Sequence, residues 1–117
     1  MSENFFFEKL NVYQRSLKFA IALCRIASKF PIKFSRIRDQ LTGAVISIPL
    51  NIAEGSGRKS VKERINFYKI SRSSIFEIVP ILEICLKLKL IEKTISQDLR
   101  EEAVVLSKMI NGLISSL

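Results

Sequence analysis

Apolar residues recur every three or four positions through four segments of the chain, which is the spacing of helices that bury one face. The segments run over about residues 8–29, 35–54, 60–90 and 96–117. This pattern predicts an all-α fold, an antiparallel up-and-down four-helix bundle. We expect a single domain over residues 1–117, in which residues 1–7 form a short N-terminal extension.

Proline and glycine mark the points where these helices should bend or end. Pro31 should close the first helix, because the residue before a proline is pushed out of the helical region. Pro49 lies inside the second segment and predicts a kink, and Pro80 predicts a bend in the third. Gly55 and Gly57 should end the second helix, since glycine adopts the left-handed conformation easily.

Serines are the expected caps of the last two helices. Ser60 and Glu63 have the spacing of a capping box, in which the serine oxygen accepts from the Glu63 amide and the glutamate accepts from the Ser60 amide. Ser96 stands at the expected start of the fourth helix and should cap it.

The first and third helices each have two apolar stripes. One stripe is enough for the core of a monomeric bundle, so a second stripe is typical of an interface and favours self-association. The alternative is a core that covers more than one face of these helices. In the first helix, one stripe is Tyr13, Leu17, Ala20, Cys24 and Ala27, and the other is Val12, Phe19, Leu23, Ile26 and Phe30. In the third helix, one stripe is Ile65, Tyr68, Ile75, Val79, Leu82 and Leu86, and the other is Phe67, Ile70, Ser74, Ile78, Ile81, Cys85 and Leu88.

The chain is strongly basic, and its charge is uneven. The net charge of the 117 residues is +8. Residues 1–72 contain 14 Lys and Arg against 5 Asp and Glu (+9), whereas residues 73–117 contain 5 against 6 (−1). Such a bias in a small protein favours a polyanionic partner, above all nucleic acid. A solvated surface without a polyanion is the alternative.

Several classes of chemistry are excluded by composition. There is no histidine, so Ser–His and Cys–His nucleophile pairs cannot form, and the two cysteines cannot complete a Cys/His zinc site. Cys24 and Cys85 lie among apolar residues and are predicted to be reduced core residues in a cytoplasmic protein. We expect no metal, no cofactor and no membrane association, because the longest uncharged run, residues 41–53, is too short to span a bilayer.

The stretch GSGRKS, residues 55–60, resembles a phosphate loop only superficially. A P-loop requires G-x-x-x-x-G-K-[ST] between a strand and a helix, and here both the spacing and the preceding helix disagree. A helix joint fits better. Cations around the N-terminus of a helix oppose its dipole, which indicates a bound anion; side chains that simply point into solvent are the alternative. The candidate nucleic-acid-binding residues are Arg58, Lys59, Lys62, Arg64 and Lys69.

Arg72 falls inside an apolar stripe and therefore needs an acceptor. Glu54, with Asn51 one turn before it, is the nearest candidate, so Asn51, Glu54 and Arg72 are predicted to form a structural polar cluster. Catalysis by Glu54 or Tyr13 lacks support, because neither has a partner acid or a metal cluster. The sequence therefore favours a protein that is not an enzyme.

Several segments resemble one family. LNVYQRSL (10–17), SIPLNIAEGSGRKS (47–60) and FYKISRSSIFEI (67–78) are similar to the proteins encoded in intervening sequences of bacterial large-subunit (23S) ribosomal RNA, and to the accessory protein of diversity-generating retroelements. The resemblance implies a four-helix bundle that assembles as a ring-shaped homopentamer with a central channel and a basic surface. In the retroelement branch it also implies binding to nucleic acid and a reverse transcriptase. Two family arginines after Gln40-Leu41 are replaced here by Thr42 and Gly43.

The leading functional hypothesis is a non-enzymatic homo-oligomer whose Lys and Arg side chains contact the phosphates of RNA or DNA. It would act with ribosomal RNA intervening sequences or in a retroelement-type ribonucleoprotein. The alternative is a protein-interaction scaffold, with an acidic or reverse-transcriptase-like protein as its partner and no direct role in nucleic-acid binding.

Overall fold

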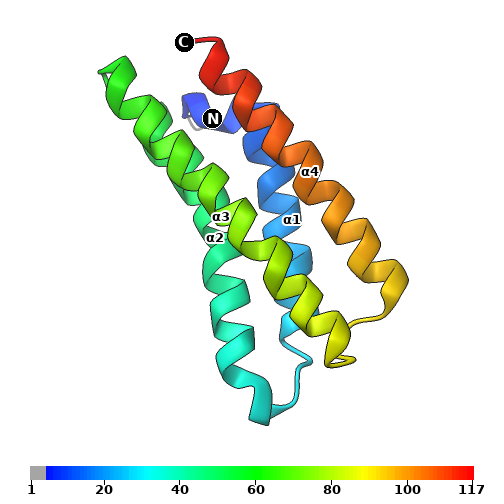
Figure 1. The fold of residues 1–117 in the computed structure, drawn as a ribbon. Coiled ribbons are helices and arrows are strands. Elements are labelled where there is room, and N and C mark those ends of the chain that lie inside the picture. Colours follow the sequence, from blue (N-terminus) through cyan, green and yellow to red (C-terminus); the bar gives the residue numbers. More distant parts are fainter. Residues whose placement is uncertain (1–4) are drawn as a thin grey trace.

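The computed structural model describes residues 5–117, and in this range the chain forms helices and no strand (Figure 1). Four α-helices follow one another: α1 (Asn11–Ala27), α2 (Ser35–Ser56), α3 (Val61–Lys87) and α4 (Lys93–Ser115). Two short 3-10 helices, η1 (Phe6–Lys9) and η2 (Ile32–Phe34), precede α1 and α2. The all-α prediction is confirmed. Residues 1–4 of the expected N-terminal extension lie outside the described range, and η1 begins within the remainder of it.

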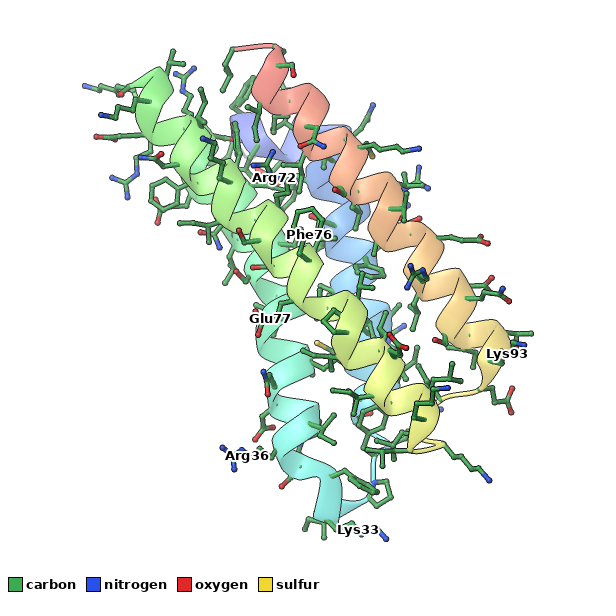
Figure 2. All side chains as sticks on the ribbon, in the orientation of Figure 1. Lys33, Arg36, Arg72, Phe76, Glu77 and Lys93 are labelled. Carbon is green, nitrogen blue, oxygen red and sulfur yellow. The ribbon has the colours of Figure 1, made fainter. Side chains whose placement is uncertain are left out.

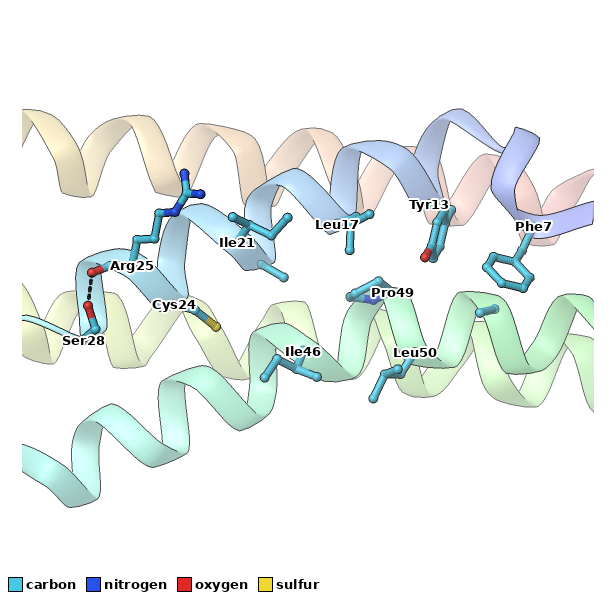
Figure 3. A pocket seen from close by; sticks show the side chains of 12 residues that line it. Phe7, Tyr13, Leu17, Ile21, Cys24, Arg25, Ser28, Ile46, Pro49 and Leu50 are labelled. Carbon is cyan, nitrogen blue, oxygen red and sulfur yellow. Dashed lines mark hydrogen bonds between the residues drawn. The ribbon is translucent and has the colours of Figure 1, made fainter. Parts of the chain in front are cut away.

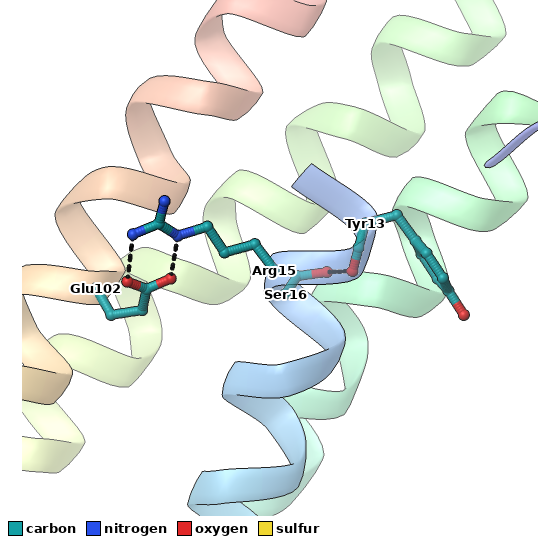
Figure 4. Close-up of polar contacts among 4 residues, drawn as sticks. All are labelled: Tyr13, Arg15, Ser16 and Glu102. Atoms are coloured by element: carbon teal, nitrogen blue, oxygen red, sulfur yellow. Dashed lines mark hydrogen bonds and ion pairs between the residues drawn. The ribbon is translucent and has the colours of Figure 1, made fainter. Parts of the chain in front are cut away.

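Consecutive helices run in opposite directions and pack side by side (Figure 1). The contact between α2 and α3 is the most extensive, and that between α1 and α4 is the least. The α1–α4 seam is bridged by a bidentate ion pair, in which Arg15 Nε and Nη2 donate to Glu102 at 2.7 and 2.9 Å (Figure 4). The Cα trace measures 43 × 33 × 22 Å, so the four-helix bundle is flattened rather than square in cross-section.

The core shows how the apolar stripes are used. Both stripes of α3 are buried along the middle of the helix, so the core covers two of its faces, and the expected free second stripe is absent there. In α1 the stripe that contains Phe19 and Leu23 is buried, whereas the stripe of Tyr13 and Leu17 remains partly exposed. The largest fully buried side chains are Tyr68, Leu23, Leu41, Ile48, Ile52, Ile75, Ile78, Leu82, Leu106, Ile110, Val45 and Cys85.

The helix caps differ from the sequence prediction at two places. Ser60 Oγ accepts from the Glu63 amide at 3.3 Å, which gives half of the predicted capping box. The fourth helix begins earlier than expected: its cap is Glu92, and Ser96 lies buried inside α4. The prediction was wrong because a serine near the start of a helix need not occupy the cap position, and it can also lie one turn inside the helix, as Ser96 does.

Gly55 and Gly57 do not adopt the left-handed conformation that the sequence suggested. Gly55 lies inside α2, and Gly57 ends the helix with φ −87°. Within residues 5–117 the single left-handed residue is Lys89, with φ 61°, just after α3. The Leu90 amide donates to the Cys85 carbonyl at 2.9 Å, which closes a Schellman motif around Lys89.

Gly55 is required by the close approach of α2 and α3. A Cβ atom at this position would lie 2.8 Å from Phe67 Cβ and 3.2 Å from the Arg64 carbonyl oxygen. Ser56 Oγ and Tyr68 Oη are 2.8 Å apart in the same region and link the two helices. These contacts therefore hold the end of α2 close to the first turns of α3.

Candidate nucleic-acid interface

The five predicted basic residues surround the α2–α3 joint and the first turns of α3. Their chemical settings differ, and the structure separates them into two groups. Arg58 and Arg64 make contacts within the joint, whereas the remaining three are exposed lysines that belong to no ion pair among residues 5–117: Lys59, Lys62 and Lys69.

Arg58 is held in place on its own hairpin. Its Nη2 atom donates to Glu54 Oε2 at 3.3 Å, one helical turn earlier. Its guanidinium carbon also lies 4.8 Å from the centroid of the Phe67 ring, within the range of a cation–π contact. The Arg58 guanidinium thus covers the Phe67 ring, and its charge is partly neutralised by the Glu54 carboxylate.

Arg64 braces the joint from the other side. Its Nε donates to the carbonyl oxygen of Arg58 at 2.6 Å, and its amide donates to the Ser60 carbonyl at 3.0 Å. A side chain committed to a backbone carbonyl has fewer donors left for a ligand. Arg64 therefore stabilises the conformation of residues 58–60 more than it extends the basic surface.

Lys59, Lys62 and Lys69 form the free part of the site, which we call the lysine flank. Lys62 and Lys69 are seven residues apart, and this spacing places them on one face of α3. In the described range only Arg15, Arg38 and Arg58 take part in ion pairs, out of 19 Lys and Arg in the chain. The three side chains of the lysine flank are thus paired with no carboxylate among residues 5–117.

The Lys and Arg residues of the basic part of the sequence do not form a single surface patch. Lys33 and Arg36 project near the start of α2, at the end of the molecule opposite to the α2–α3 joint (Figure 2). The excess positive charge is therefore divided between α1, the segment around Lys33 and Arg36, and the joint with the first half of α3, whereas residues 39–57 contain no Lys or Arg. A polyanion longer than one phosphate fits such a distribution better than a small anion does.

The predicted cluster of Asn51, Glu54 and Arg72 is not formed. Arg72 Nη1 donates to Asn111 Oδ1 of α4 at 2.8 Å, and Glu54 pairs with Arg58. Arg72 lies on the side of α3 that faces α4 (Figure 2), and Glu54 lies on α2. The position of Arg72 in an apolar stripe correctly indicated that its side chain needs a hydrogen-bond acceptor. Proximity along the sequence could not identify the helix that supplies this acceptor.

Asn51 belongs to a different set of hydrogen bonds between α2 and α3. Its Nδ2 atom donates to the carbonyl and hydroxyl oxygens of Ser47, both at 2.8 Å. Ser74 donates to the same Ser47 hydroxyl at 2.8 Å, and Ser71 donates to the Ile48 carbonyl at 2.9 Å. The sequence signal for this network was present, since Ser74 stands inside an apolar stripe where a small polar residue needs a partner.

A second surface feature is an apolar groove between α1 and α2, with a volume of about 590 Å³ (Figure 3). Tyr13, Leu17 and Ile21 form its wall on α1, and Ile46, Pro49 and Leu50 form its wall on α2. Tyr13 packs edge-on against Phe7 at 4.8 Å between ring centroids. We refer to this feature as the α1–α2 groove.

The two thiols of the chain and its carboxylates are the side chains that could supply a thiolate nucleophile or the ligands of a metal site. Burial raises the pKa of the Cys24 and Cys85 thiols, which disfavours the nucleophilic thiolate. Among residues 5–117 no three Cys, Asp or Glu side chains gather as a metal site. Over the same residues, no helix has the length and apolarity that a bilayer crossing requires.

Comparison with known proteins identifies a family. The sequence model described as "23S rRNA-intervening sequence protein" matches residues 8–112, nearly the whole chain. A crystal structure of a protein with unknown function from the S23 ribosomal protein family of Bacteroides thetaiotaomicron has a similar fold, with a TM-score of 0.79 and 20% sequence identity. The match covers 88% of this chain and 97% of that one. No curated protein sequence matches the chain.

Proposed function

Since the chain belongs to the 23S rRNA-intervening sequence protein family, we propose that it binds the phosphate backbone of RNA or DNA as a homo-oligomer and catalyses no reaction. It would act in the cytoplasm, with ribosomal RNA intervening sequences or in a retroelement-type ribonucleoprotein. The proposed assembly is a pentameric ring, in which bends at Pro49 and Pro80 set the angle between protomers.

The lysine flank is the observation that supports this proposal most strongly. Lys59, Lys62 and Lys69 are exposed and have no carboxylate partner within residues 5–117. Lysines of this kind contact phosphates as point charges and read no base sequence. The binding should therefore be strongly dependent on salt and only weakly dependent on sequence.

Assembly would strengthen a contact that is weak in one protomer. Three lysines supply a small number of phosphate contacts, and linked copies raise the effective concentration of each further contact. A ring that repeats the lysine flank would bind a long polyanion far more tightly than one protomer does.

The experiment is a salt titration of binding to a structured RNA, with a DNA duplex alongside. The test variant is Lys59→Glu/Lys62→Glu/Lys69→Glu. The matched control is Lys93→Glu/Arg100→Glu/Lys108→Glu, which changes the net charge by the same amount on exposed positions of α4. The native mass and the helical content of each variant are measured in the same buffer.

We expect the test variant to lose affinity for both nucleic acids, while the α4 control retains most of it. Equal losses in the two variants would show that net charge alone attracts the polyanion and that the lysine flank is no site. Absence of wild-type binding at low salt, with the fold intact, would overturn the nucleic-acid proposal.

The scaffold hypothesis has one observation in its favour, the exposed α1–α2 groove, which is too apolar to bind a phosphate backbone. An acidic or reverse-transcriptase-like protein would then be guided by the basic charge and held by apolar contacts. Capture of such a protein from the native host that persists after nuclease treatment, together with no binding to purified RNA or DNA, would favour this function.

A further inference from the structure

The α1–α2 groove leaves large apolar side chains open to solvent. Leu50 is 62% exposed and Ile21 is 45% exposed, although both belong to the lining of the groove. Their neighbours Leu17 and Ile46 are also exposed. A contiguous apolar surface of this kind marks an interaction site rather than ordinary surface variation.

A second apolar surface lies on α3. Phe76, Pro80, Ile84 and Leu88 follow one another at intervals of four residues, which form one continuous ridge on a helix. Phe76 is 62% exposed and Ile84 is 50% exposed. We call these four residues the α3 ridge. An exposed aromatic residue on such a ridge is the usual anchor of a protein interface.

The groove and the ridge lie on opposite sides of the protomer. In Figure 2 α3 lies in front of α1 and α2, and Phe76 is seen on it. In Figure 3, which looks into the groove, α3 and α4 lie behind α1 and α2. One protomer can therefore use its groove and its ridge at the same time, with two different neighbours.

The charges around the two surfaces are complementary. Arg25 lines the groove and takes part in no ion pair within residues 5–117. Two exposed carboxylates, Glu77 and Glu83, and one exposed lysine, Lys87, flank the ridge, so these three side chains have a net charge of −1. On a larger scale the groove belongs to the part of the chain with net charge +9, and the ridge to the part with net charge −1. Complementary charge of this kind favours a second copy of the chain as the occupant.

We propose that the α1–α2 groove of one protomer receives the α3 ridge of the next, with Phe76 as the anchor, in a head-to-tail contact. The inference rests on the homo-oligomer of the proposed function and names the surfaces that build it. Such a contact joins two different patches, so it propagates from copy to copy until the rotation closes a ring.

The test uses one variant for each surface. Phe76→Arg destroys the ridge and keeps the groove, and Leu50→Arg destroys the groove and keeps the ridge. Val104→Arg is the matched control, because Val104 is an exposed apolar residue of α4 outside both surfaces. Native mass is measured over a concentration series, and circular dichroism verifies the helical fold.

We expect both single variants to be monomeric where the wild type and Val104→Arg are oligomeric, since loss of an interface anchor weakens association by about 30-fold or more. A mixture of Phe76→Arg and Leu50→Arg should form a 1:1 heterodimer and nothing larger. The intact groove of the first variant can bind the intact ridge of the second, and no further contact remains.

Alkylation of Cys24 gives an independent readout, because this thiol lines the groove whereas Cys85 is buried in the core. Labelling of wild-type Cys24 should slow as protein concentration rises, and this protection should be absent in Phe76→Arg. Phe76 is not part of the lining of the groove, so a second copy is needed to transmit the effect to Cys24.

The outcomes separate this inference from the proposed function. If Leu50→Arg is monomeric but Phe76→Arg stays oligomeric, the groove meets some other surface and the inference is wrong. If neither variant changes the native mass, the assembly uses other surfaces. If the wild type is itself monomeric, the homo-oligomer and the inference both fail; a nuclease-resistant protein partner lost in Leu50→Arg would then be the true occupant. The salt titration of RNA binding tests the lysine flank independently of these results.

Discussion

The two halves of α3 present different chemistry to solvent. The first half carries Lys62 and Lys69 of the lysine flank, and the second half carries the ridge that begins at Phe76. The inner face of the helix is the same throughout, a continuous line of buried residues from Tyr68 to Cys85. A single helix can therefore serve two separate surfaces, because its packing does not depend on what its outer face displays.

The halves also differ in how they are attached to the bundle. The first half is linked to α2 by hydrogen bonds that involve Tyr68, Ser71 and Ser74 and by the close approach at Gly55. The second half is held mainly by apolar contacts of residues such as Ile78 and Leu82. Directional contacts fix the position of the basic half, which would suit the phosphate contacts that we propose for it.

The largest expected effect is a double dissociation between the halves. Lys59→Glu/Lys62→Glu/Lys69→Glu should weaken RNA binding by more than about tenfold and reduce the log–log salt slope by about 3, since each lost lysine removes roughly one phosphate contact. Its native mass should equal that of the wild type. Phe76→Arg should do the reverse when the RNA is too short to reach a second protomer: its native mass falls, and its lysine flank still binds, because no contact with a linked copy is lost. Loss of both properties in either variant, with this short RNA, would mean that the halves act as one surface.

The second prediction concerns the attachment of the basic half. Gly55→Ala should lower the free energy of unfolding by about 1–3 kcal/mol, because its Cβ would overlap Phe67 and the Arg64 carbonyl. Denaturant melts measure the change. Gly43→Ala is the control: it lies in α2 with open space around it and should stabilise the protein by up to about 1 kcal/mol. A stabilised Gly55→Ala variant would contradict the close approach.

A smaller effect is expected where the two halves meet. Ser71→Ala removes the buried hydrogen bond to the Ile48 carbonyl and should cost about 1 kcal/mol of stability. Ser73→Ala, at an exposed position two residues later, should stay within about 0.5 kcal/mol of the wild type. Chemical denaturation compares the two, and equal effects would show that the Ser71 bond has no net value.

The smallest effect on stability is expected at the contact between α1 and α4. It gives a reference against which the contributions of the α3 contacts can be compared. Arg15→Gln should lower Tm only slightly, and the difference should shrink with added salt, because the ion pair with Glu102 is exposed. The carboxylate raises the pKa of Arg15, so the pair is stabilising below the unfolded pKa and is lost only above it. The difference should be constant between about pH 6 and 9. Arg36→Gln, which breaks no ion pair among residues 5–117, should show no salt-dependent difference.

The sequence was a good guide to the helices and to the position of the joint between α2 and α3. Helical spacing identified all four helices within a few residues of their observed ends, and the basic joint stands where the sequence placed it. It was a poorer guide to contacts. Arg72 was recognised as a side chain in need of an acceptor, but Asn111 lies 39 residues away on another helix. Arg58 and Arg64 were grouped with the lysines as candidate nucleic-acid-binding residues, and only the fold showed that both are engaged within the joint.

What the sequence determined by itself is therefore local: the periodicity that makes α1 to α4, the Ser60 cap, and the uneven charge. These depend on residues within a turn or two of one another, and the backbone hydrogen bonds of a helix close over the same distance. What the tertiary structure decided is which apolar stripe is covered, why Gly55 is a glycine, and where the groove and the ridge lie. Each of these depends on which helices come together, because burial and hydrogen-bond partners belong to pairs of helices and not to either one alone.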